Sequence, residues 1–91
     1  MDVKQNKVLL VEDDIDLRET ISEYLNGVGF EVILAENGSL GIQKAIQHRP
    51  DVIVCDISMP GITGYEVFNM LHQINTTSVI PFIFLSAKAS K

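Results

Sequence analysis

The stretch KVLLVEDD at residues 7–14 places an apolar run directly before three acidic residues. A second stretch, DVIVCD at residues 51–56, repeats the pattern and ends in Asp56. Apolar runs of four or five residues are typical of strands buried in a parallel sheet. The carboxyl ends of parallel strands lie at one edge of an open α/β sheet, where such folds place their chemistry. We therefore predict that acidic side chains from two strands converge at this edge.

The rest of the chain alternates between strand and helix patterns. Strands are expected at residues 8–11, 30–35, 52–55 and 79–85, and helices at residues 17–28, 40–46 and 67–74. Asp14 or Asp16 can cap the first helix and Thr63 the third, because short polar side chains accept hydrogen bonds from free backbone N–H groups. This regular alternation predicts one α/β domain with a parallel sheet.

Short polar or glycine-containing segments join these elements. Asn37-Gly38 predicts a turn, and residues 75–78 predict a polar connector. Gly61 and Gly64 are expected to set the backbone conformation of the loop that follows Asp56.

Size and composition restrict the function classes. The 91 residues fit one domain, and the net charge of −5 disfavours nonspecific nucleic-acid binding, which needs a basic face. The single cysteine, Cys55, lies inside an apolar run and is expected to be a small buried hydrophobic residue. No apolar stretch is long enough to span a membrane, and the first residues lack a signal-peptide core. A soluble, cytoplasmic protein is therefore expected.

The acidic residues also predict a metal site. Carboxylates that converge at one edge repel one another unless a cation joins them, and Mg²⁺ prefers oxygen ligands. Asp13 and Asp56 are expected to ligate Mg²⁺ directly. Glu12 is expected to reach the ion through water or to hold its waters in place. The backbone carbonyl of Ser58, two residues beyond Asp56, is a further candidate ligand.

Four motifs of the sequence resemble those of the receiver domains of two-component response regulators. They are residues 10–14 (LVEDD), 51–61 (DVIVCDISMPG), 63–67 (TGYEV) and 84–87 (FLSA), in the family's order and spacing. The resemblance implies a flavodoxin-like α/β fold with strand order 2-1-3-4-5. It implies that Asp56 accepts a phosphoryl group, that Glu12 and Asp13 form the acidic metal pocket, and that Ser86 binds a phosphoryl oxygen. The implied partner is a histidine kinase or a phosphotransfer protein, and the domain is not expected to be a turnover enzyme.

The chain departs from the family at its end. It stops at Lys91, before the family's fifth strand, its last helix and its phosphoryl-binding lysine. We expect a receiver domain over residues 1–91 that is incomplete at its C-terminus. The strand at residues 79–85 would then be an unpaired apolar edge beside an uncovered face of the sheet. Exposed edges and apolar patches favour association, so a homodimer or higher oligomer is expected.

Three other functions compete with a phosphoacceptor. The first is a non-switching, receiver-like module that mainly self-associates. The second is an aspartyl-nucleophile phosphatase, which usually carries a second Asp two residues after the first as acid and base. Ser58 occupies that position here, which disfavours a phosphatase. The third is a flavodoxin-like cofactor binder, which the acidic loop after Val11 disfavours because it would repel a phosphate.

Overall fold

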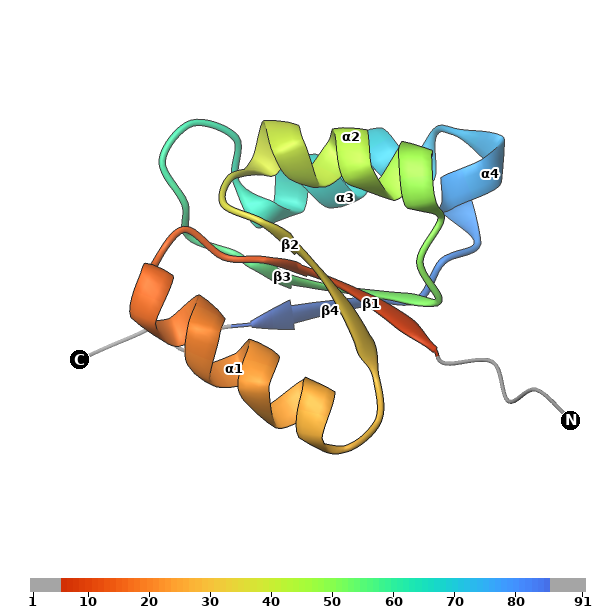
Figure 1. Ribbon diagram of the computed structural model, residues 1–91. Helices are drawn as coiled ribbons and strands as arrows, with labels where there is room; N and C mark the ends of the chain where they lie inside the picture. The colour runs from red at the N-terminus through yellow and green to blue at the C-terminus, as the bar shows by residue number, and fades with distance from the viewer. Residues whose placement is uncertain (1–5, 86–91) are drawn as a thin grey trace, which may run out of the picture.

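The computed structural model describes residues 6–85, which form a four-stranded parallel sheet with helices on both faces (Figure 1). The elements are β1 (Lys7–Val11), α1 (Ile15–Gly27), β2 (Glu31–Ala35), α2 (Gly38–His48), β3 (Val52–Asp56), α3 (Gly64–His72), α4 (Asn75–Ser78) and β4 (Phe82–Leu85). The strand order is β2-β1-β3-β4, and every neighbouring pair is parallel. The predicted flavodoxin-like α/β fold is confirmed, with the predicted order over these four strands.

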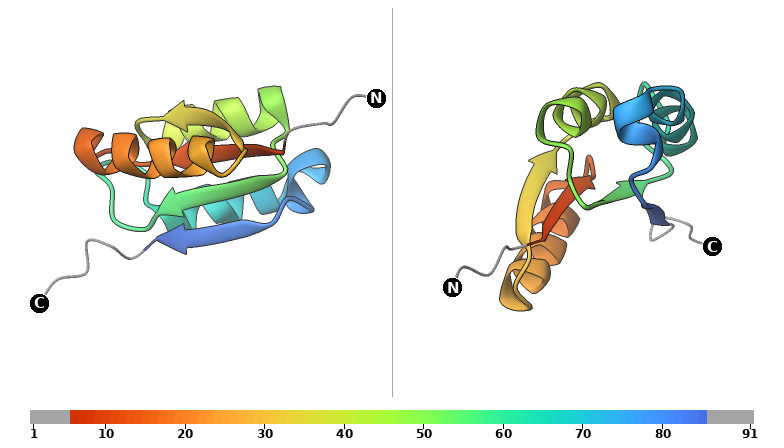
Figure 2. Two further views of the ribbon diagram at one scale, coloured as in Figure 1. Left: turned by 60° about the horizontal axis from the view of Figure 1, so that its bottom comes forward. Right: turned by 90° about the vertical axis from the view of Figure 1, so that its right-hand side faces the viewer.

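The helices form two unequal layers. Helix α1 packs against β1 and β2 on one face, and α2, α3 and α4 lie on the other (Figure 2). Residues of β1 point alternately into the two layers, which explains why all of Val8–Val11 is buried. Leu9, Val11 and Ile53 belong to the main core beneath α2 and α3. None of the helices that the structure describes is long and apolar enough to cross a membrane.

The structure decides between the two acidic residues that were predicted as possible caps of the first helix. Asp14 is the cap of α1, and its Oδ1 accepts hydrogen bonds from the backbone N–H groups of Asp16 and Leu17 at 3.0 and 3.1 Å. Asp16 lies inside the first turn instead. Thr63 caps α3 as predicted, in a reciprocal capping box with Glu66. Each cap fixes where a loop at the acidic edge becomes a helix.

Two connections differ from the sequence-based predictions. Asn37 is the cap of α2 rather than part of a separate turn, because its Oδ1 accepts from the Leu40 N–H at 2.8 Å. Helix α2 consequently begins at Gly38. Residues 75–78, predicted only as a polar connector, form α4, a single helical turn. The buried Thr77 hydroxyl donates to the Leu71 carbonyl at 2.6 Å and so ties this turn to the end of α3.

The fourth strand begins later than predicted, at Phe82 and not at residue 79. Strand β4 begins at Phe82, because residues 79–81 follow the last turn of α4. Ladder pairing with β3 starts at Phe82, opposite Ile53. Phe82 and Phe84 pack against Phe68 of α3 with ring centroids 5.2 and 5.8 Å apart. Ile83 therefore points to the other face, where its side chain is 52% exposed.

Cys55 is buried in β3, as predicted. Burial, followed by the nearby carboxylates of Asp56 and Glu12, raises the pKa of its thiol from 9.0 to about 12. Above pH 9 the unfolded thiol ionises while the folded thiol keeps its proton, so the unfolding free energy should fall between about pH 9 and 12. Denaturant titrations across this range should show a steeper fall for the parent than for Cys55→Ala. Equal slopes for the two proteins would contradict the raised pKa.

Candidate functional site

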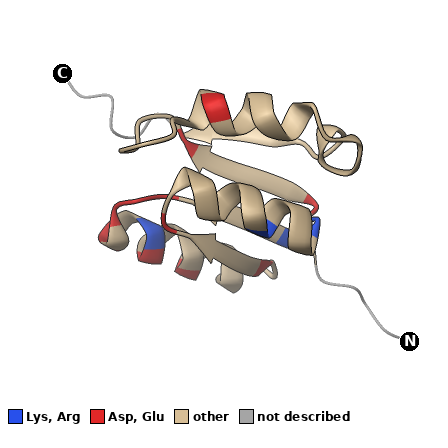
Figure 3. Cartoon of the chain, turned by 90° about the horizontal axis from the view of Figure 1, so that it is seen from above, with Lys and Arg blue, Asp and Glu red and all other residues tan. Residues whose placement is uncertain are grey.

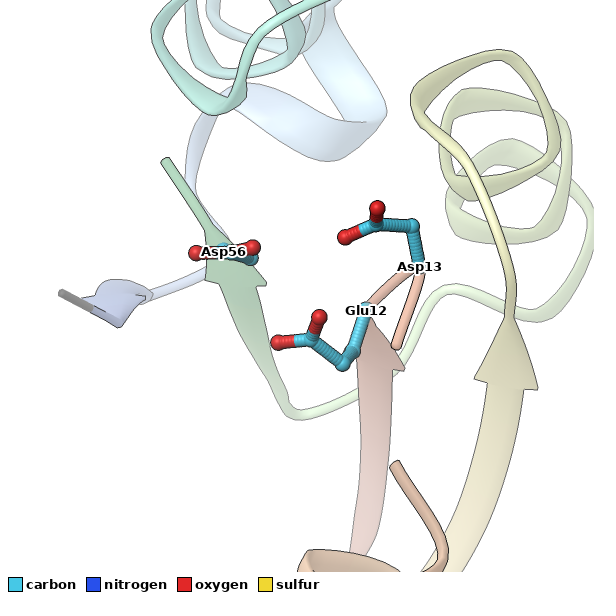
Figure 4. Close-up of side chains that lie close together, drawn as sticks. All are labelled: Glu12, Asp13 and Asp56. Carbon is cyan, nitrogen blue, oxygen red and sulfur yellow. The ribbon is translucent and has the colours of Figure 1, made fainter. Parts of the chain in front are cut away.

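Three carboxylates from two strand ends converge at the edge of the sheet. Glu12 and Asp13 follow β1 directly, and Asp56 is the last residue of β3 (Figure 4). One carboxylate oxygen from each residue lies within 4.8 Å of the other two. Glu12 and Asp56 are buried, at 0% and 1% exposure, and Asp13 is half-buried. The predicted convergence of acids from separate strands is therefore present.

Backbone pairing fixes the position of Glu12. The Glu12 N–H donates to the Ala35 carbonyl at 3.0 Å, which extends the ladder between β1 and β2 by one residue. Its Oε2 accepts from the Asp14 N–H at 2.9 Å. The residue after the strand is therefore held by the sheet on one side and by the start of α1 on the other.

Asp56 is held by β3 and by the loop that follows it. The next residue, Ile57, donates its N–H to the Leu85 carbonyl at 3.2 Å and accepts from the Gly64 N–H at 2.9 Å. The first residue of α3 therefore packs directly on the end of β3. Gly61 in this loop has a φ of +79°, so the prediction that it sets the loop conformation is confirmed. Gly64 has no such φ, and its role is close packing against the strand end.

Two other predicted site residues, Ser58 and Ser86, are not part of the carboxylate cluster. Ser58 is exposed in the loop after β3, two residues beyond Asp56. Ser86 lies outside the described residues. Asp14, the third consecutive acid, is the cap of α1 and is not one of the three clustered carboxylates.

The cluster has the chemistry of a hard-cation site. Figure 3 shows acidic residues along the loop after β1 and at the end of β3. Three carboxylates this close, two of them buried, repel one another strongly, and a divalent cation would remove that repulsion. The neighbouring Cys55 is not one of the clustered residues, so the cluster offers only oxygen ligands. An oxygen-only donor set fits Mg²⁺ better than zinc.

The structure adds one residue that the sequence did not indicate. Arg18, in α1, donates from Nη1 to the backbone carbonyl of Glu12 at 2.8 Å. A spacing of six residues between an acid and an arginine is unremarkable in sequence. Only the turn that Asp14 caps brings the guanidinium back to the end of β1.

Comparisons with known sequences agree with this architecture. The family model of the response regulator receiver domain matches residues 8–91. The probable transcriptional regulator ycf29 of Pyropia yezoensis is 45% identical over 90% of this chain and 37% of its own length. Protein PilH of Pseudomonas aeruginosa is 35% identical over 90% of this chain and 68% of its own length. The chain thus spans less than two fifths of the length of the ycf29 proteins that it matches.

Solved structures show the same fold. The chemotaxis protein CheY4 of Vibrio cholerae superposes with a TM-score of 0.89 at 33% identity, over 96% of this chain and 72% of its own. The receiver domain of the sensor histidine kinase PA1611 from Pseudomonas aeruginosa PAO1 gives a TM-score of 0.89 at 27% identity, over 97% of this chain and 72% of its own. That structure contains a magnesium ion coordinated in its active site cleft. The matched residues, the shared fold and the carboxylate cluster agree. This chain therefore belongs to the response regulator receiver domain family, the phosphoacceptor domains of two-component signalling.

Proposed function

We propose that this domain accepts a phosphoryl group on Asp56, with Mg²⁺ held by Glu12, Asp13 and Asp56, from a histidine kinase or a phosphotransfer protein. The observation that carries the proposal is the meeting of these three carboxylates at the ends of β1 and β3. We also propose that the protein is cytoplasmic and that this segment does not itself bind nucleic acid. The net charge of −5 supports the latter.

The proposed step is an in-line displacement at phosphorus. A carboxylate oxygen of Asp56 forms a new P–O bond while the P–N bond of a phosphohistidine breaks. The bonding electron pair leaves with the imidazole nitrogen, which then takes a proton from solvent. When bound, Mg²⁺ supplies positive charge that offsets the negative charge on the phosphoryl oxygens. The product is an acyl phosphate on Asp56. The proposed catalysis goes no further than this self-catalysed phosphoryl transfer and the later autodephosphorylation, so we do not propose that the domain is an enzyme.

The other residues have supporting roles in this proposal. Glu12, which is buried and held by the Asp14 N–H, keeps its carboxylate beside the cation. The Ser58 carbonyl is a further proposed ligand, and the Ser86 hydroxyl is proposed to donate to a phosphoryl oxygen. The acyl phosphate carries a charge of nearly −2 where the carboxylate of Asp56 carried −1, and its three oxygens would draw Ser86 toward them, which is the proposed switch.

A small phosphodonor tests the proposal without a partner protein. With acetyl phosphate and Mg²⁺, we expect a mass gain of one phosphoryl group, located on the peptide that contains Asp56. Chelating the metal should prevent it. Asp14→Asn should retain the labelling, because Asn caps a helix as well as Asp and Asp14 lies outside the cluster. Absence of the mass gain would refute the proposal, and continuous donor hydrolysis without a labelled species would favour a phosphatase.

We also propose self-association through β4, which would be the main property of a receiver-like module that never switches. Within residues 6–85, β4 pairs only with β3, so its outer edge carries backbone groups available to another strand. Ile83 is 52% exposed on the face that α1 leaves open beside β4 (Figure 2). A second copy offers the same apolar edge, and two such edges can pair symmetrically.

Light scattering tests this association. We expect a dimer or larger species at high micromolar concentration, and a shift to monomer in Ile83→Lys, since charged side chains on edge strands block pairing. Ile46→Lys is the matched control, because Ile46 is similarly exposed at 46% but lies on α2. A stable monomer of the parent protein at that concentration would contradict the proposal.

A further inference from the structure

Arg18 connects α1 to the peptide that joins two of the clustered acids. Its Nη1 donates to the Glu12 carbonyl at 2.8 Å, and its side chain is half-buried. That carbonyl belongs to the same planar peptide as the Asp13 N–H, so its position sets the directions of both residues. Asp14, the helix cap, accepts from the Arg18 backbone N–H at 2.9 Å through its carbonyl. The backbone and the side chain of Arg18 thus hold both ends of the segment that carries Asp13.

Helix stability does not explain a cation at this position. Arg18 is the fourth residue of α1, near the positive end of the helix dipole, where acidic residues stabilise and basic residues do not. The contact instead serves the end of β1. Together with the Glu12 N–H bond to Ala35 and the Oε2 bond from Asp14, it fixes the Glu12 backbone and side chain at three points.

We propose that Arg18 is a positioning residue for the divalent-cation site, which it serves by holding the Glu12–Asp13 peptide in the geometry that brings the three carboxylates together. This inference rests on the proposed function of that site. A hydrogen bond to a residue that orients a metal ligand commonly changes metal affinity by an order of magnitude when it is removed. Arg18 acts through Glu12 and Asp13 and is not itself a ligand.

The sign of the effect on Mg²⁺ affinity separates positioning from simple charge. A guanidinium near a cation site repels the cation, so removing it should tighten Mg²⁺ binding if charge alone matters. If Arg18 positions the ligands, removing it should weaken binding. We expect Arg18→Met to bind Mg²⁺ roughly tenfold more weakly than the parent protein, measured by isothermal titration calorimetry. Arg18→Lys, which keeps a donor but not the planar fork, should recover part of the loss.

Lys44→Met is the matched control. Lys44 also donates to a backbone carbonyl near the end of a strand, that of Leu34 in β2, at 2.5 Å. It lines the same open cavity of about 350 Å³ as Arg18. Its removal makes the same change in net charge but leaves the Glu12–Asp13 peptide untouched. We expect Lys44→Met to bind Mg²⁺ as tightly as the parent protein or slightly more tightly.

Two further measurements complete the test. At saturating Mg²⁺, Arg18→Met should be labelled by acetyl phosphate at close to the parent rate, with the loss confined to low Mg²⁺. A cooperative unfolding transition of Arg18→Met in metal-free buffer is the check that this variant is folded. Unchanged or tighter Mg²⁺ binding in a folded Arg18→Met would overturn this inference while leaving the proposed function intact. If the parent protein neither binds Mg²⁺ nor is labelled, the proposed function itself fails.

Discussion

Asp56→Asn is expected to abolish phosphoryl labelling and, in metal-free solution, to stabilise the fold. The amide has no nucleophilic carboxylate oxygen, so the acyl phosphate cannot form. The same change removes one of three negative charges whose oxygens lie within 4.8 Å, from a side chain that is only 1% exposed. Relief of repulsion in a buried site should raise the unfolding free energy by about 1–2 kcal/mol. Labelling followed by mass spectrometry and urea unfolding in a chelator measure the two effects.

A second aspartate, which directly precedes the same strand, controls for this substitution. Asp51, just before β3, is exposed, and its Oδ2 accepts from the Lys7 N–H at 2.7 Å. Asp51→Asn should keep full labelling and leave the unfolding free energy the same or slightly lower. Persistent labelling of Asp56→Asn would place the acceptor elsewhere. A less stable Asp56→Asn in metal-free buffer would show that repulsion does not dominate the cluster.

The carboxylate cluster could be predicted from the sequence, because the order and direction of the strands bring its three residues to the same edge of the sheet. Parallel strands end at one edge, so acids that follow two separate apolar runs must approach each other once both runs are strands of one sheet. Glu12, Asp13 and Asp56 satisfy this condition, and the structure places their oxygens together. The cap at Asp14 was predictable in the same way, because it depends on residue type and on the helix that follows.

Features that depend on tertiary contact could not be predicted. Asn-Thr-Thr-Ser is a poor helix sequence, and α4 forms because the Thr77 hydroxyl reaches the Leu71 carbonyl in α3. Gly38 suggested a turn, but it lies in α2 where a Cβ would come within 3.0 Å of the Ile62 backbone oxygen and side chain. Arg18 has no sequence signature, since its acceptor is a backbone carbonyl. In each case the partner is an atom whose position only the folded chain defines.

Gly64→Ala is expected to destabilise the domain by about 3 kcal/mol or more, or to prevent folding. A Cβ on Gly64 would lie 2.3 Å from the Asp56 carbonyl oxygen, 2.9 Å from the Ile57 Cα and 3.0 Å from the Asp56 carbonyl carbon. These are backbone atoms at the end of β3, where the Ile57 N–H is paired with Leu85, so they cannot move aside without breaking the ladder. Helix α3 would have to withdraw, and overpacking against a rigid backbone has costs of this size.

Gly27→Ala provides the control for Gly64→Ala. A Cβ on Gly27, at the end of α1, would meet nothing within 4 Å. Because alanine is the better helix former, this variant should match or exceed the parent stability by up to about 1 kcal/mol. Urea unfolding of the two variants measures the contrast. If Gly64→Ala unfolds at the parent midpoint, α3 and the end of β3 can separate at little cost. The loop between them would then not hold Asp56 rigidly, and β3 alone would position Asp56 in the cluster.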